Sequence, residues 1–257
     1  MSSGFETAKL HSWESGNDWP AVETTGTPYA IVTDVKRNGS QACRITLDSN
    51  QGENYQAGYR RCIFRETLNN SNADVQRAER YLDHYFYTHS SRIASGTWFP
   101  SGTLVWEIHG PNGDWPQGTS LVAPHALQWR NGEWQYRVHT GQLQGAAFGG
   151  QIYNRSLGLT SLNGNLWHDW IIEILYDDPG IIRVYHRLEG EADFTLVLDR
   201  PNDPGICYVS SKTEDHRYYR LEGCYGPLPS PTSTQTVMWL DNNGRHLTLD
   251  AARTVFG

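Results

Sequence analysis

Hydrophobic and polar residues alternate one by one along much of the chain, which is the period of a β-strand with one buried face. The clearest case is the segment 126–137, where two alternating runs flank Asn131-Gly132, a dipeptide that favours a two-residue type I′ hairpin. Counting outward by twos gives an apolar face of Leu127, Trp129, Trp134, Tyr136 and Val138. The opposite face holds Gln128, Gln135, Arg137 and His139. We predict that the apolar face is core and that the polar face points outward or into a cleft.

The same pattern recurs towards the C-terminus. Residues 167–176 and 181–186 are strand-like runs separated by Asp-Asp-Pro-Gly, and Asp241-Asn242-Asn243-Gly244 forms a turn after the strand 236–240. One segment, at about 72–84, has the composition of a helix. Regularly spaced hairpins predict an all-β fold, a two-sheet antiparallel jelly-roll sandwich with at most one or two short helices. We expect a single domain over 1–257, in which 1–39 supplies an N-terminal strand and loops.

The strand at 103–110 places a carboxylate and an imidazole on one face. Simple alternation points Leu104, Trp106 and Ile108 to the core, together with Ile182 of a later strand, and leaves Val105, Glu107 and His109 on the other side. Glu107 and His109 then stand about 7 Å apart along the strand, a pairing suited to general acid–base chemistry. Two solvated polar residues on an outer face are the alternative interpretation.

Composition excludes some functions and leaves others open. With 21 Lys and Arg against 28 Asp and Glu, the net charge of −7 gives no basic field for nucleic acid, while 10 Trp and 14 Tyr suit the stacking of sugar rings. We expect no membrane span, and the first ten residues lack a signal-peptide pattern. Disulfides among the four cysteines Cys43, Cys62, Cys207 and Cys224 stay open. We expect no cofactor, except that turn residues Asp199, Asp203 and Asp241 leave a structural calcium ion open.

Three strand-like segments resemble motifs of the alginate-lyase and heparin-lyase-I type of polysaccharide lyase, and they occur in that family's order. Glu107-Ile108-His109 resembles the Gln-Ile-His strand, and the segment 59–68 resembles an early strand with two arginines four apart, here Arg61 and Arg65. The segment 218–226 is similar to the late Tyr-Phe-Lys-Ala-Gly-Val-Tyr strand, with Tyr219, Gly223 and Tyr225 matched and Leu221 at the lysine position. Matching Arg220 to the lysine requires one extra residue. The resemblance implies a concanavalin-like jelly roll and covers about 40–250.

The resemblance also implies a reaction and a site. A polysaccharide lyase removes the C5 proton of a uronic acid, neutralises the neighbouring carboxylate and protonates the departing glycosidic oxygen. It implies catalytic roles for Tyr225 as base or acid, His109 as base or neutralising group, Arg65 as carboxylate ligand, and Glu107. The residues expected to bind substrate are Arg61, Gln128, Arg137, His139, Tyr219 and Arg220. The expected partner is an acidic polysaccharide, and the expected location is extracellular or on a virion or cell surface.

Glu107 departs from the family pattern, because the motif carries glutamine there. An ionised glutamate would repel a uronate, so either Glu107 is protonated, or an arginine pairs with it, or no uronate binds at that point. Two functions besides the lyase therefore stay open. One is a glycan-binding or structural jelly roll without catalysis, and the other is a glycoside hydrolase, which would require a second carboxylate about 5–10 Å away.

Overall fold

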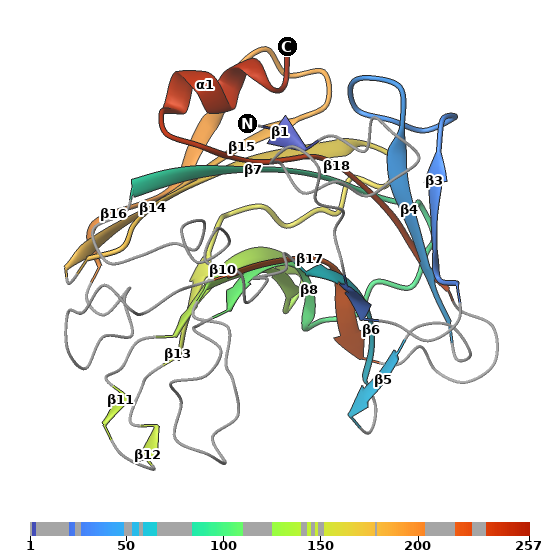
Figure 1. Cartoon of the computed structure of the whole chain (residues 1–257), viewed down its shortest axis with the longest axis horizontal. Coiled ribbons are helices and arrows are strands. Elements are labelled where there is room, and N and C mark those ends of the chain that lie inside the picture. Colours follow the sequence, from blue (N-terminus) through green and yellow to red (C-terminus); the bar gives the residue numbers. More distant parts are fainter. Residues whose placement is uncertain are drawn as a thin grey trace.

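The computed structural model describes residues 2–3, 21–23, 27–48, 53–56, 59–65, 84–109, 125–139, 143–144, 147–148, 152–177, 179–203, 219–227 and 235–257. Within these ranges the chain is almost entirely β-structure in two antiparallel sheets that lie face to face (Figure 1). The predicted all-β sandwich is confirmed.

The first sheet lies uppermost in Figure 1. Its order is β16 (Thr195–Asp203), β15 (Gly180–Leu188), β14 (Trp167–Leu175), β7 (His84–Ile93), β18 (Thr236–His246), β4 (Ala42–Leu47) and β3 (Tyr29–Val32), and β1 (Ser2–Ser3) pairs with β18. The predicted hairpin across Asp-Asp-Pro-Gly is present, because β14 and β15 pair from His168 with Leu188 to Leu175 with Ile181. A short helix, α1 (Leu249–Thr254), lies over the outer face of this sheet (Figure 1). It covers Phe86 and Ile171 with Ala252 and Phe256.

The second sheet lies beneath the first. Its order is β13 (Ile152–Ser156), β10 (Glu133–His139), β9 (His125–Arg130), β8 (Thr103–His109), β17 (Tyr219–Pro227), β6 (Tyr59–Arg65) and β2 (Ala21–Glu23), and β5 (Glu53–Gln56) pairs with β6. The short strands β11 (Leu143–Gln144) and β12 (Ala147–Phe148) pair only with each other. Figure 1 shows that β13, at one end of this sheet, and β6, near the other end, bend away from the first sheet, so its outer face is concave.

The core lies between the two sheets and is rich in aromatic rings. Trp134 packs edge-to-face on Trp170 of the opposite sheet, with the two ring centroids 5.2 Å apart, and Tyr87 packs on Trp106 at 5.5 Å. All residues predicted to be buried are buried: Leu104, Trp106, Ile108, Leu127, Trp129, Trp134, Tyr136 and Ile182. Three cysteines, Cys43, Cys62 and Cys224, are buried here as thiols, and burial raises the pKa of Cys224 to about 12. Cys207 lies outside the described residues.

The predicted hairpin at Asn131-Gly132 is confirmed. Both residues have positive φ, 54° and 79°, and Glu133 pairs with Arg130, so the loop has two residues as a type I′ turn requires. The pairing of Trp134 with Trp129 and of Gln135 with Gln128 continues the predicted alternation of faces.

Two expectations about strands are wrong, and β-bulges are the reason in both. The register between β8 and β9 shifts between Leu104 and Trp106, so Val105 joins Trp106 and Ile108 in the core while Leu104 moves to the outer face opposite Gln128. In β18 the residues 241–244 do not end the strand. They form an irregularity within it, with Asn242 at φ 55°, and pairing with β7 resumes at Gly244. The helix expected at 72–84 lies outside the described residues up to 83, and His84 begins β7.

Candidate active site

The concave outer face of the second sheet carries polar side chains in rows, because antiparallel neighbours point to the same side of a sheet. One row crosses the sheet from β6 to β13 and consists of Arg61, Tyr225, Leu104, Gln128, Gln135 and Ser156. A second row, further along the strands, consists of Glu107, Ala126, Arg137 and Asn154, and the backbone positions of Leu221 and Arg65 continue its register. The register therefore brings Arg61, Tyr225, Glu107, Gln128 and Arg137 to one face.

Glu107 has an arginine partner on the same face. The Nη2 atom of Arg137 lies 4.0 Å from Oε2 of Glu107, and the two side chains are 19% and 8% exposed. Ala126 stands between them in the row, and its small side chain leaves the guanidinium room to reach across β9. Of the alternatives for Glu107, the structure thus supports pairing with an arginine. This contact lies at the outer distance of an ion pair.

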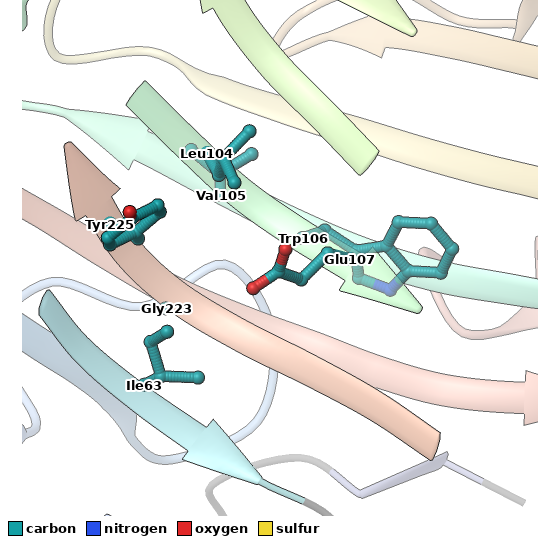
Figure 2. A pocket seen from close by; sticks show the side chains of 7 residues that line it. All are labelled: Ile63, Leu104, Val105, Trp106, Glu107, Gly223 and Tyr225. Carbon is teal, nitrogen blue, oxygen red and sulfur yellow. The ribbon is translucent and has the colours of Figure 1, made fainter. Parts of the chain in front are cut away.

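Glu107 and Tyr225 line one pocket, which Figure 2 shows from close by. The pocket encloses about 160 Å³, including space open to solvent, and its other lining residues are Ile63, Leu104, Val105, Trp106 and Gly223. In Figure 2 the Glu107 carboxylate lies at the edge of β17, and the Tyr225 ring lies further along the same strand. A carboxylate and a phenol facing the same small space can both exchange protons with one sugar ring.

Gly223 keeps this pocket open. Its φ of 151° lies in the region that favours glycine, and a Cβ atom there would approach the carbonyl oxygen of Cys62 to 2.1 Å. The register between β17 and β8 also shifts between Glu222 and Tyr225, so β17 has a bulge at Gly223. The bulge adds one residue to β17 and so sets where Tyr225 stands relative to β8.

Tyr225 is held from the side of β6. Its ring stacks on Tyr59, with centroids 5.6 Å apart and planes at 27°, and in register it pairs directly with Arg61. Arg65, which the resemblance implied as the carboxylate ligand, pairs with Leu221 four residues away. Arg61 is therefore the arginine of the motif that stands beside Tyr225.

A chain of hydrogen bonds on β9, β10 and β13 was only partly foreseen. Gln128 donates to Asn154 at 2.8 Å, Gln135 donates to Glu133 at 2.7 Å, and the Ser156 hydroxyl also donates to Glu133. The bonds from Ser156 and Gln135 lower the pKa of Glu133. The two glutamines were predicted from the sequence, but Asn154, Glu133 and Ser156 were not. The alternation of polar residues at 154 and 156, next to the hairpin, was the available signal.

The register does not bring His109 and Tyr225 together. His109 pairs with Tyr219, whereas Tyr225 pairs with Leu104, five residues back along β8. At the usual rise per residue, these two backbone positions are about 17 Å apart along the sheet. Simple motif matching could not reveal it, because two bulges change the pairing of β8. The side chains of Arg65, His109, His139, Tyr219 and Arg220 lie outside the described residues.

The expected calcium ligands have other partners. Asp203 accepts from Arg200 at 3.1 Å and from Arg155 at 3.4 Å, and Asp199 accepts from Arg183 at 2.9 Å. Asp241 accepts from the backbone N–H groups of Arg37 and Asn38. Within the described part of the chain, no cluster of three or more His, Cys, Asp or Glu side chains is placed to hold a metal ion.

A family model described as polysaccharide lyase matches residues 5–243. The chain belongs to the polysaccharide lyase family. No functionally curated protein matches it by sequence. The concave face with its pocket therefore belongs to a lyase. Within the described residues, no helix is long and apolar enough to cross a membrane.

Solved structures share the fold of this lyase at low sequence identity. The endo-β-1,4-glucuronan lyase from the fungus Trichoderma reesei superposes with a TM-score of 0.67 at 15% identity, covering 90% of this chain and 91% of that one. The alginate lyase from Aplysia kurodai gives 0.52 at 14% identity over 86% and 87%. A β-glucanase catalytic domain from Podospora anserina gives 0.50 at 16% identity over 96% and 91%. Because the last is not described as a lyase, the fold alone does not decide the chemistry.

Proposed function

We propose that this lyase cleaves a uronate-containing polysaccharide by β-elimination in the pocket between Glu107 and Tyr225. The family assignment supports an elimination reaction, and two similar structures are a glucuronan lyase and an alginate lyase, whose polymers consist of uronic acids. The observation that carries the proposal is the shared pocket of Tyr225 and Glu107, with Arg61 opposite Tyr225 in register.

Tyr225 is the proposed proton-transfer group. Its oxygen removes the proton from C5 of the uronate, the C5–H electron pair forms the C4–C5 double bond, and the bond from C4 to the glycosidic oxygen breaks. The departing oxygen then takes a proton from the same hydroxyl. A phenol with an ordinary pKa near 10 needs positive charge nearby to act as a base, and Arg61 on the adjacent strand supplies it.

Arg61 is also the proposed ligand of the substrate carboxylate. A guanidinium binds a carboxylate through two parallel charge-assisted hydrogen bonds, which stabilises the negative charge that builds up after C5 deprotonation. Glu107 stays paired with Arg137 on the opposite side of the pocket, so its charge is offset where the polymer binds. No cofactor is required by these roles.

His109 and Tyr219 are a second candidate pair, because the register sets them directly opposite each other. Single variants separate the two centres. If the pocket is the site, Tyr225→Phe abolishes cleavage and Tyr219→Phe leaves most of it; the reverse result moves the chemistry to the pair at His109.

The test of the function is incubation with alginate, glucuronan and a neutral β-glucan. We expect unsaturated uronate products, detected by ultraviolet absorbance, from at least one of the two uronic-acid polymers. New reducing ends without unsaturation would indicate a hydrolase, and binding without any new chain ends would indicate a non-catalytic glycan-binding module. Because such polymers are extracellular materials, we propose that the lyase acts outside the cell or on a cell or virion surface.

A further inference from the structure

The outer face of the first sheet carries a tryptophan ring with an arginine on each side. This face lies on the opposite side of the molecule from the pocket. Trp239 of β18 pairs in register with Arg44 of β4 on one side and with Arg92 of β7 on the other. Met238 and Leu240, its neighbours along β18, point into the core, so Trp239 points outward with both arginines. These three strands are adjacent in the sheet (Figure 1).

The two arginines differ from several others in the chain. Arg37 and Arg187 bind Asp169, and Arg155 binds Asp203, whereas among the described residues neither Arg44 nor Arg92 forms an ion pair with a carboxylate. The guanidinium of Arg92 lies over the Trp239 ring, 5.6 Å from its centroid, and Arg44 is exposed. In a chain of net charge −7, two uncompensated cations beside one ring are a local positive site.

The carboxylates nearest to these arginines along the strands have other partners: Asp241 accepts from the backbone N–H groups of Arg37 and Asn38, and Asp48 accepts from Gln235. Ala30 pairs with Arg44 on the outer side of the sheet, and Thr46 pairs with Val237 two residues along the strands. The strands of Arg44 and Arg92 are separated by one strand, so their backbones are about 10 Å apart. Two guanidinium groups at that spacing, with an aromatic ring between them, suit a chain of sugar rings that carries repeated carboxylates.

We propose that Arg44, Trp239 and Arg92 form a second binding site for an acidic polysaccharide, separate from the catalytic pocket. The choice of a uronate polymer as the ligand rests on the proposed function, but binding at this face does not require cleavage. Such a site holds the polymer on the enzyme between cleavage events. It should therefore affect long polymers and leave short fragments, which reach only the pocket, unaffected.

The test is affinity electrophoresis of the full chain in gels that contain alginate or, as the uncharged control, dextran. We compare the wild type with Arg44→Ser, with Arg44→Ser/Arg92→Ser and with Arg253→Ser. Arg253 lies exposed on α1, so its removal changes net charge in the same direction without touching this site. Because Arg44 is exposed, its replacement should not disturb folding. Cleavage of an alginate tetrasaccharide is measured for every variant in parallel.

We expect alginate to bind the double variant about fivefold more weakly than the wild type, the middle of the range for two exposed charge contacts, while Arg253→Ser binds like the wild type. The difference should shrink at high salt and be absent in dextran. Equal retardation of the double variant and Arg253→Ser would overturn the second site, as would a wild type that alginate does not retard. Tetrasaccharide cleavage should be unchanged. If the wild type cleaves neither this tetrasaccharide nor alginate nor glucuronan, the proposed function fails, while the gel comparison still decides the second site.

Discussion

A buried pair of histidines between the sheets predicts that acid weakens the fold. His168 and His186 are almost fully buried, and Nδ1 of His168 lies 2.9 Å from Nε2 of His186. The other nitrogen of His168 is 2.9 Å from the carbonyl oxygen of Leu162, which can only accept, so it carries the proton. Nδ1 then has none, and it accepts from His186. Both rings are therefore neutral.

Protonation of either ring would break this arrangement. Burial, with the nearby His168 as a smaller cause, lowers the pKa of His186 to about 3, and burial also lowers the pKa of His168. In the unfolded chain a histidine titrates at about 6.5. Between these values the unfolded state binds more protons than the folded state, so the free energy of unfolding falls as pH drops below 6.5.

At moderate acidity, the loss in free energy of unfolding depends mainly on the pKa of histidine in the unfolded chain. Each pH unit below 6.5 costs about 1.4 kcal/mol per histidine, so His186 alone removes about 2 kcal/mol between pH 6.5 and pH 5. His168 acts in the same direction. Such a loss is a large fraction of the stability of an ordinary domain.

The assay is urea unfolding at pH 7, 6 and 5, followed by tryptophan fluorescence. His186→Gln keeps an N–H donor towards His168 but cannot titrate, so its stability should fall by about 2 kcal/mol less than that of the wild type between pH 7 and pH 5. His84→Gln serves as the control, because that ring is partly exposed on the outer face and far from this pair in the sheet register. Equal pH dependence of the wild type and His186→Gln would refute the reasoning.

Two further predictions concern the pocket. Gly223→Ala should lower the free energy of unfolding by about 3 kcal/mol in urea titrations, because the added Cβ meets the Cys62 carbonyl oxygen, and Gly132→Ala, which meets no atom within 4 Å, should cost less. A loss for Gly223→Ala no greater than that for Gly132→Ala would contradict the stated geometry. Arg137→Gln should lower kcat/KM on a uronate polymer about tenfold by removing this positive charge from beside Glu107, and adding Glu107→Gln should restore part of it. Additive losses in the double variant would show that the pair does not act as a unit.

Local alternation predicted the sheets well, and it failed where a strand gains a residue. The turn at Asn131-Gly132 and the faces of β9 and β10 follow from the sequence, because a two-residue loop fixes the register on both sides. Leu104 and Val105 exchanged places because a bulge breaks the period of two, and nothing in that stretch of sequence marks the bulge. The same physics governs the site. The residues that gather on the concave face were predictable, but the partner of each was not, since His109 meets Tyr219 only through a register set by long-range pairing.

The pairing of Glu107 with an arginine was one of three alternatives that the sequence left open, and the reason for it is electrostatic. A carboxylate that is nearly buried on a sheet face needs a cation or a proton, and the alternation placed Arg137 on the same side of the sheet as Glu107. For Gly223, by contrast, the structural reason could not be predicted from the sequence. Its place in the motif was visible in the sequence, but the clash with Cys62 that makes it necessary became visible only with β6 and β17 paired.

The most direct test of the account is cleavage of a uronate polymer by the wild type and by Tyr225→Phe, with unfolding midpoints measured on the same samples. We predict unsaturated product from the wild type, a loss of about a hundredfold or more in rate for Tyr225→Phe, and equal midpoints, because the ring that stacks on Tyr59 is kept and only the hydroxyl is removed. A Tyr225→Phe enzyme that forms unsaturated product at the wild-type rate would contradict it.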